Sequence, residues 1–169
     1  MPYLWLGLII TASVVLQSTV VSFFQVGNAR PDLLLMVTVS AALISGRTSG
    51  VSVGFFSGLL WDLLTAQFFG MYTLAKLITG YTVGSFEKKV FKDNPLLPLV
   101  AIFLATIFHE IILYICALTL GIEAPFFLLI GKNVVPSAIY NCLLMPFVYF
   151  GMFSFRKLIW PLGRHTTEF

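Results

Sequence analysis

The amino-acid sequence predicts an all-α integral membrane protein of about six transmembrane helices, in a single transmembrane domain over residues 1–169. Charged residues make up only 10% of the chain, whereas a soluble domain carries about a quarter. Apolar residues make up 59%, with 17 phenylalanines, and the mean hydropathy is +0.97. Because a spanning helix needs about 20 residues, the chain holds five or six spans and leaves no room for a separate catalytic domain.

Apolar runs separated by polar residues give the expected order of helices. The first run has no basic residue before it and no small-residue cleavage site after it, so we expect a retained helix. The second is short for a span and follows Arg30 and Pro31. The fifth has Pro95 in its first turn, with Asp93 or Asn94 as its cap. The six segments are Tyr3–Phe24, Asp32–Ser45, Ser49–Ala66, Met71–Phe86, Pro95–Leu120 and Pro125–Phe155.

The last of these segments is too long for one simple span. The polar pair Lys132–Asn133 divides it into a short apolar piece and a helix that begins at about Val135. The sequence leaves open whether residues 125–133 enter the membrane and return, or only lead into the final helix.

Lysines and arginines indicate the orientation, because they gather on the cytoplasmic side of membrane proteins. With six spans, one side holds seven of them and the other side only Arg30 and Lys132, while Lys76 lies within a span. This asymmetry predicts a multi-pass membrane protein with both termini in the cytoplasm. The seven are Arg47, Lys88, Lys89, Lys92, Arg156, Lys157 and Arg164.

A stripe of small residues runs along the third segment. Gly50, Gly54 and Gly58 follow one another at intervals of four, and Asp62 continues the spacing. Four residues turn a helix through about 400°, so the glycines share a face about 80° wide with Asp62 at its margin. Such a face lets another backbone approach closely. It packs against a sister helix, with Asp62 as a polar clasp, or it receives a helix of another protein.

Three further ionisable residues fall inside apolar segments, where charge is costly. Asp62 precedes the 66–70 loop by about as many residues as Lys76 follows it. Lys76 therefore either pairs with Asp62 or extends outward alone. Glu110 lies near the middle of its span, and His109 points about 100° away from it. We expect Lys76, His109 and Glu110 to be polar clasps between helices, and a ligand or proton site at His109 and Glu110 is the alternative.

Familiar catalytic patterns fail at specific positions. His109-Glu110 begins like a zinc-protease helix, but the second histidine four residues later is replaced by Leu113. Gly54-Phe55-Phe56-Ser57-Gly58 has its serine in the wrong place for a nucleophile turn. We therefore expect no enzyme activity, no metal, no cofactor and no nucleic acid partner.

The third and fourth segments carry a resemblance to a known family. The run GFFSGLLWDLL over residues 54–64, then Gly70, Gly80-Tyr81 and Gly84, resembles the core pattern of the bacterial rod shape-determining protein MreD family. The run Arg30-Pro31-Asp32-Leu33-Leu34 is also similar to that family.

This resemblance implies a non-catalytic membrane scaffold of the cell-wall elongation machinery that helps to maintain rod shape. It implies a fold similar to the substrate-binding subunits of energy-coupling-factor transporters. The implied partner is the single-span protein MreC, and through it the MreB filament and the glycosyltransferase–transpeptidase pair that builds peptidoglycan.

The same fold resemblance supplies the alternative of a vitamin-binding subunit of an uptake transporter. Such subunits dock through an alanine-x-x-x-alanine pair in the first span, where this chain has Ala12 alone. In favour of this alternative, His109, Glu110 and Asn141 would line a small polar cavity.

Overall fold

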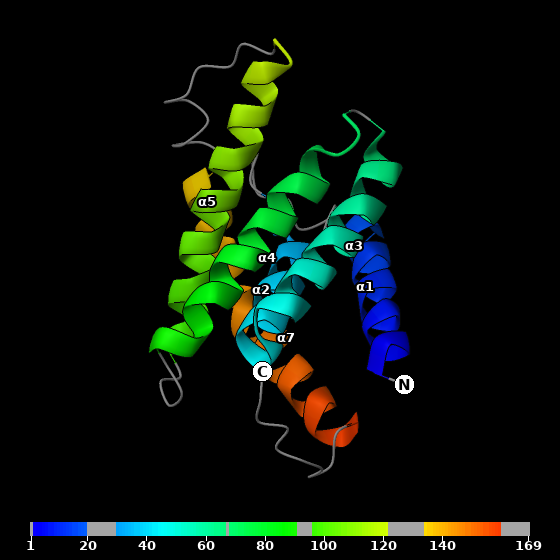
Figure 1. Ribbon diagram of the computed structural model, residues 1–169, viewed down its shortest axis with the longest axis vertical. Helices are drawn as coiled ribbons and strands as arrows, with labels where there is room; N and C mark the ends of the chain where they lie inside the picture. The colour runs from blue at the N-terminus through cyan, green and yellow to red at the C-terminus, as the bar shows by residue number, and fades with distance from the viewer. Residues whose placement is uncertain (1, 20–29, 67, 91–95, 122–133, 160–169) are drawn as a thin grey trace.

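The computed structural model describes residues 2–19, 30–66, 68–90, 96–121 and 134–159, and these form six α-helices packed in one bundle (Figure 1). The predicted all-helical fold and the six expected helices are therefore confirmed for the described part of the chain. The helices are α1 (Pro2–Thr19), α2 (Leu33–Ser45), α3 (Arg47–Thr65), α4 (Met71–Val90), α5 (Leu97–Thr119) and α7 (Val135–Ile159).

Several helix ends differ from the apolar runs that predicted them. α3 begins two residues earlier, at Arg47, and α4 continues to Val90, because helical hydrogen bonding does not stop where hydropathy falls. α5 begins at Leu97 with Pro98 in its first turn. The predicted start at Asp93, Asn94 or Pro95 lies outside the described residues, as do Lys132–Asn133 and the rest of 125–133. α7 begins at Val135, as expected.

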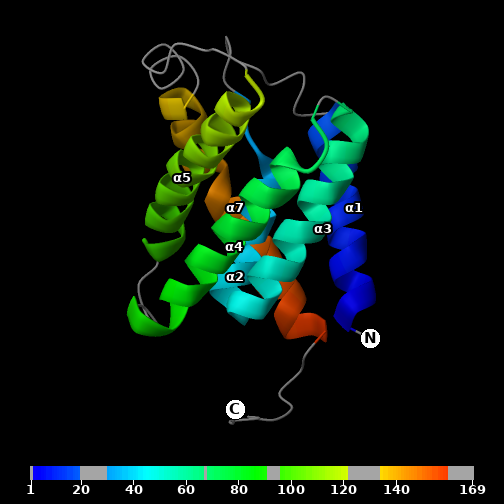
Figure 2. The same cartoon turned by 45° about the horizontal axis from the view of Figure 1, so that its top comes forward.

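α2 is the centre of the bundle. It contacts each of the other five described helices, and its residues 34–42 are all buried. Its 13 residues extend for only about 20 Å, which is less than the roughly 30 Å of a bilayer's hydrocarbon core. The extended residues 30–32 bring the chain in among the helices before α2 begins (Figure 2). The start of α2 is thus enclosed by protein, which is the setting in which irregular backbone is tolerated at membrane depth.

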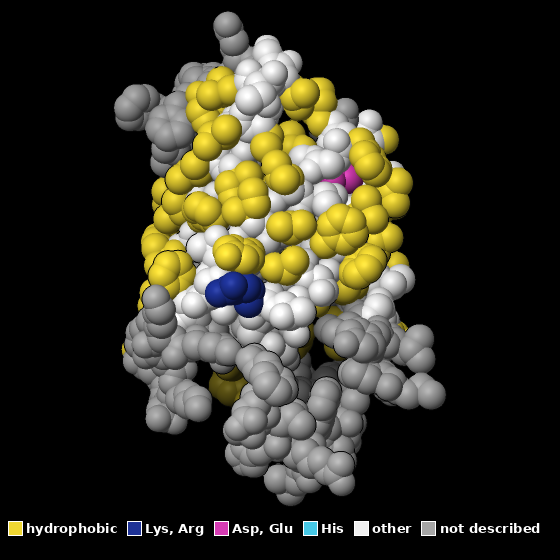
Figure 3. Space-filling view, in the orientation of Figure 1, with side chains coloured by type: hydrophobic (Ala, Val, Ile, Leu, Met, Phe, Trp, Pro, Cys, Tyr) yellow, Lys and Arg dark blue, Asp and Glu magenta, His cyan; other side chains and the backbone are white. Residues whose placement is uncertain are grey.

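The surface and the interior are reversed relative to a soluble protein. Apolar side chains are spread over the described part of the face seen in Figure 3, with one basic patch just above the grey residues and one small acidic patch. Leu143 and Phe147 on α7 are 69% and 76% exposed, whereas Lys76, Asp62 and His109 are almost completely buried. Lipid accepts the exposed apolar side chains and excludes the polar ones. Within the described residues, Leu97–Thr119 and Val135–Ser154 are each long and apolar enough to cross a membrane.

The ends of the helices fall into two groups. The start of α1 (blue) and the end of α7 (red) lie at the same end of the bundle in both ribbon views (Figures 1 and 2). The turn between α3 and α4, over residues 66–70, lies at the opposite end, together with the end of α5. The polar residues described next lie between these two ends.

Candidate functional site

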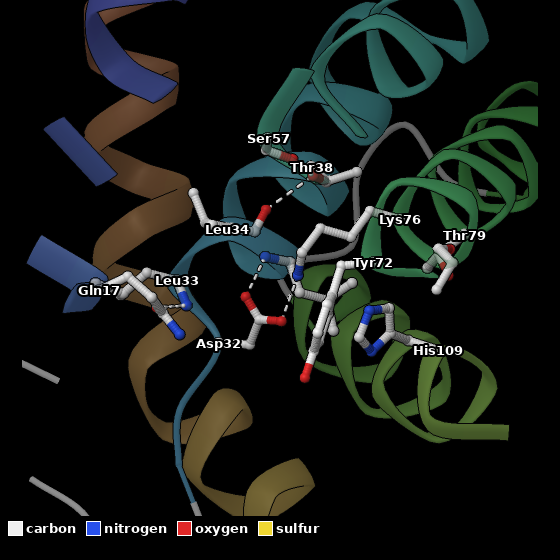
Figure 4. A network of polar contacts seen from close by, with 12 residues as sticks. Gln17, Asp32, Leu33, Leu34, Thr38, Ser57, Tyr72, Lys76, Thr79 and His109 are labelled. Carbon is white, nitrogen blue, oxygen red and sulfur yellow. Dashed lines mark hydrogen bonds and ion pairs between the residues drawn. The ribbon is translucent and has the colours of Figure 1, made fainter. Parts of the chain in front are cut away.

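A cluster of polar side chains surrounds the buried start of α2 (Figure 4). We call it the polar core and define it by its members from five parts of the chain: Gln17 of α1, Asp32, Lys76 of α4, Thr106 of α5 and Asn141 of α7. The first backbone N–H groups of a helix have no partner within the helix. At the start of α2 these partners are Asp32, whose side chain is 22% exposed, and side chains of neighbouring helices.

Asp32 is the N-cap of α2 and also the ionic partner of Lys76. One carboxylate oxygen, Oδ1, accepts a hydrogen bond of 2.8 Å from the backbone N–H of Leu35. The other, Oδ2, accepts from the Lys76 ammonium group. Lys76 is completely buried, and a buried ammonium group needs an acid beside it because an isolated charge is very costly there. The pair therefore joins the start of α2 to the second turn of α4.

Two amide side chains complete the start of α2. Gln17 accepts a hydrogen bond of 2.8 Å from the N–H of Leu33 and donates one of 3.1 Å to the carbonyl of Pro31. Asn141 accepts from the N–H of Asp32 at 2.9 Å and donates to the hydroxyl of Thr106 at 3.0 Å. The oxygen and the nitrogen of each amide therefore both make hydrogen bonds within the protein. Asn141, which one alternative placed in a ligand cavity, bonds to α5 and to the start of α2 instead.

The glycine stripe of α3 faces α4. A Cβ atom added at Gly54 would lie 2.5 Å from the carbonyl oxygen of Lys76, and one at Gly58 would lie 2.5 Å from the Cα of Thr73. At Gly50 the added atom would meet the carbonyl oxygen of Gly80 at 2.6 Å. These contacts are with backbone atoms of α4, so the stripe packs against a sister helix and α4 occupies the place that a helix of another protein would take.

Asp62 extends this contact by capping α4 from a different helix. Its carboxylate accepts hydrogen bonds from the backbone N–H groups of Gly70, Tyr72 and Thr73 at 3.1, 3.1 and 2.9 Å, and from the Thr73 hydroxyl. A carboxylate at a helix N-terminus satisfies unpaired N–H groups and favours the positive end of the helix dipole. Asp62 therefore joins the end of α3 to the start of α4 by hydrogen bonds.

The predicted ion pair between Asp62 and Lys76 is wrong. Asp62 binds the first turn of α4, and Lys76 lies three residues beyond Thr73, about 4.5 Å further along the helix axis. From there its ammonium group reaches Asp32 instead of Asp62. The alternative in which Lys76 extends outward alone is also wrong, because its side chain is completely buried.

Replacing Asp62 by alanine is expected to lower the stability by about 2 kcal/mol, because the cap accepts from three backbone groups. For a chain of this size that corresponds to a fall in Tm of several degrees. Asp62→Asn keeps one acceptor oxygen and should lose less than half as much. Thermal unfolding of the purified protein in detergent measures both, and an asparagine variant as unstable as the alanine variant contradicts the cap.

His109 and Glu110 lie beside the polar core without joining its hydrogen bonds. His109 is buried next to Tyr72 of α4, with ring centroids 6.4 Å apart (Figure 4). Neither of its ring nitrogens has a hydrogen-bond partner among the described residues. Its Nδ1 lies 3.8 Å from Oε1 of Glu110, which is beyond hydrogen-bond distance. The two side chains are therefore neighbours, although they leave the helix in directions about 100° apart. The expected hydrogen bond from Glu110 to another helix is not made within the described part of the chain.

Sequence reasoning missed part of the polar core. It named Lys76 and Asn141 and noted Asp32 only as the start of the second segment and in the resemblance. It did not single out Gln17 or Thr106. Two signals were present: an aspartate directly after a proline and before an apolar run is a typical N-cap, and a lysine within a span requires an acid.

Among the described residues no group of three metal-ligating side chains is found.

The comparison with protein families identifies the family of this chain. A family model described as rod shape-determining protein MreD matches residues 2–159. Comparisons with curated proteins and with solved structures gave no match. The match includes all six described helices, the glycine contact between α3 and α4, and the polar core. The chain therefore belongs to the MreD family of rod shape-determining membrane proteins.

Proposed function

We propose that this protein is a non-catalytic scaffold of the machinery that elongates the bacterial cell wall. It binds an MreC-like single-span protein and acts through it on an MreB-like filament and on the peptidoglycan glycosyltransferase–transpeptidase pair. The observation that carries this proposal is the family match over residues 2–159. The internal hydrogen bonds support a non-catalytic role. The carboxylates of Asp32 and Asp62 already bond to backbone N–H groups at helix starts, and Asp32 also pairs with Lys76.

The proposed position in the membrane is multi-pass, with both termini on the cytoplasmic side. The start of α1 and the end of α7 lie at one end of the bundle (Figures 1 and 2), which supports an even number of crossings. Arg47 is exposed at the start of α3 and stacks on Tyr81, with Cζ 4.9 Å from the ring centroid. An arginine on an aromatic ring is typical of the boundary between lipid and water.

The partner binds the outer surface of the bundle in this proposal. Helix α4 packs directly against the glycine stripe. The stripe therefore contributes to partner binding by holding the hairpin of α3 and α4 together. The exposed side chains of the helices are mainly apolar, and a single-span partner can contact them only with its own transmembrane helix.

Affinity capture of the tagged protein from detergent-solubilised membranes tests this function. The scaffold predicts recovery of an MreC-like single-span protein in at least tenfold excess over a tagged, unrelated membrane protein prepared in parallel. Recovery of an ATPase module without such a protein supports the vitamin-uptake alternative and overturns the scaffold. Depletion adds a second measurement, because loss of the scaffold should make rods swell and round, whereas a vitamin requirement with normal shape points to transport.

A further inference from the structure

Glu110 occupies an unusual position for an acidic residue. It is the fourteenth residue of α5, which runs from Leu97 to Thr119, and it lies about 20 Å from the start of that helix. Its side chain is 35% exposed on one of the two helices that are apolar enough to cross a membrane. A carboxylate is therefore open to the lipid near the middle of a spanning helix, where such groups are rare and functional.

Nothing in the described part of the chain satisfies this carboxylate. Its ion-pair contact there is with Nδ1 of His109, at 3.8 Å and beyond hydrogen-bond distance. His109 itself has no hydrogen-bond partner at either ring nitrogen among the described residues. By contrast, the acids Asp32 and Asp62 each accept two or more hydrogen bonds from this chain. Glu110 is thus the acid that the internal bonding leaves available.

Glu110 lies at the border between the buried and the exposed sides of α5. With 100° per residue, six residues within two turns lie within about 60° of it. Thr106 and Leu113 are buried, Ile107, Tyr114 and Ala117 are half-buried, and Phe103 is exposed. We call the accessible residues the Glu110 face: Phe103, Ile107, Glu110, Tyr114 and Ala117. The fully lipid-facing side of the helix, with Leu104 and Ile115, is about 120–140° away.

We propose that the Glu110 face binds the transmembrane helix of a partner that carries a side-chain hydrogen-bond donor at mid-depth. The inference rests on the proposed function, because it assigns a binding site on this protein, and a hydrogen-bonding group, to the single-span partner proposed there. A donor from the partner pairs with the carboxylate, which the lipid cannot do, and the apolar members of the face pack along the partner helix. The other exposed faces are mainly apolar, and among the described side chains they carry no carboxylate that lacks a hydrogen bond from this chain.

Cysteine crosslinking locates the partner helix. In a background with Cys116 and Cys142 replaced by alanine, single cysteines are placed at Ile107 and Ala117, and at Leu104 and Ile115 as controls on the same helix. The co-expressed single-span partner carries cysteines along the middle of its span. Ile107→Cys and Ala117→Cys should crosslink at least fivefold more than Leu104→Cys and Ile115→Cys. Equal crosslinking at all four positions, or a preference for the two controls, overturns the site.

Substitution of Glu110 tests the chemistry. Glu110→Leu should reduce capture of the partner at least tenfold, which corresponds to about 1.4 kcal/mol. Glu110→Gln keeps an acceptor oxygen and should stay within threefold of the natural protein. Tm of each variant shows that folding is intact, which is expected because leucine is favourable on a lipid-exposed surface.

The outcomes separate the two proposals. If the natural protein captures the single-span partner and Glu110→Leu captures it equally well, the Glu110 site is wrong and the scaffold stands. If the natural protein captures no such partner, the scaffold itself fails.

Discussion

Replacing Lys76 by methionine is expected to cost about 3–5 kcal/mol, because it leaves the Asp32 carboxylate inside the bundle without its ionic partner. A loss of this size removes much of the stability of a typical domain. The variant should be recovered from membranes at well under a third of the normal yield, with Tm lowered by about 10 °C. Size-exclusion chromatography and thermal unfolding in detergent measure the two effects.

A double variant identifies the partner of Lys76. Asp32→Asn together with Lys76→Met removes both charges, and the asparagine oxygen can still accept from the N–H of Leu35. Stability should recover by more than half relative to Lys76→Met alone. Asp62→Asn together with Lys76→Met is the matched control and should show no recovery, since Asp62 bonds to the start of α4. Recovery in that control, and not in the Asp32 pair, would restore the ion pair that the sequence first indicated.

Replacing Gly54 by alanine is expected to be among the most damaging single-methyl changes at the described glycines. The new Cβ would lie 2.5 Å from the carbonyl oxygen and 2.9 Å from the carbonyl carbon of Lys76. Backbone atoms cannot move aside as a side chain can, so α3 and α4 must separate and the contact along the stripe is lost. We expect a loss of about 3 kcal/mol or more, and no folded protein for Gly54→Leu.

Glycines in open positions are the controls for this change. An added Cβ at Gly7 of α1 or Gly151 of α7 meets no atom within 4 Å. Alanine should be neutral or stabilising there by up to about 1 kcal/mol, because it favours the helix more than glycine does. If Gly54→Ala is as stable as Gly7→Ala, the close contact between α3 and α4 is wrong.

The sequence predicts the helices well because their signals are local. Apolar runs and polar breaks give all six helices in order, and the glycine spacing identifies the face of α3 that another backbone approaches. The same spacing suits a sister helix and a foreign helix equally, so the identity of the neighbour comes only from the structure. Helix ends are less predictable, as the start of α3 at Arg47 shows.

The polar core is less accessible because its contacts depend on how distant segments pack. Asp32 and Lys76 are 44 positions apart, and Asp32 and Asn141 are 109 apart. Three acids, Asp32, Asp62 and Glu110, are candidates for pairing with the buried Lys76, and the choice depends on α2 beginning inside the bundle. No periodic pattern in the sequence indicates that α2 begins inside the bundle, because a short apolar run has the same composition whether it lies at the membrane surface or deep within it.

The bond between Asn141 and the start of α2 also constrains the order of assembly. A chain entering the membrane from its N-terminus places α2 long before α7 has been synthesised. Until α7 arrives, the N–H of Asp32 lacks its acceptor and the hydroxyl of Thr106 lacks the amide that donates to it. The early helices are therefore held in an unfinished arrangement, and the last helix closes the bundle by bonding to a segment near its beginning. The bonds at the start of α2 are thus complete only after α7 has been synthesised as far as Asn141.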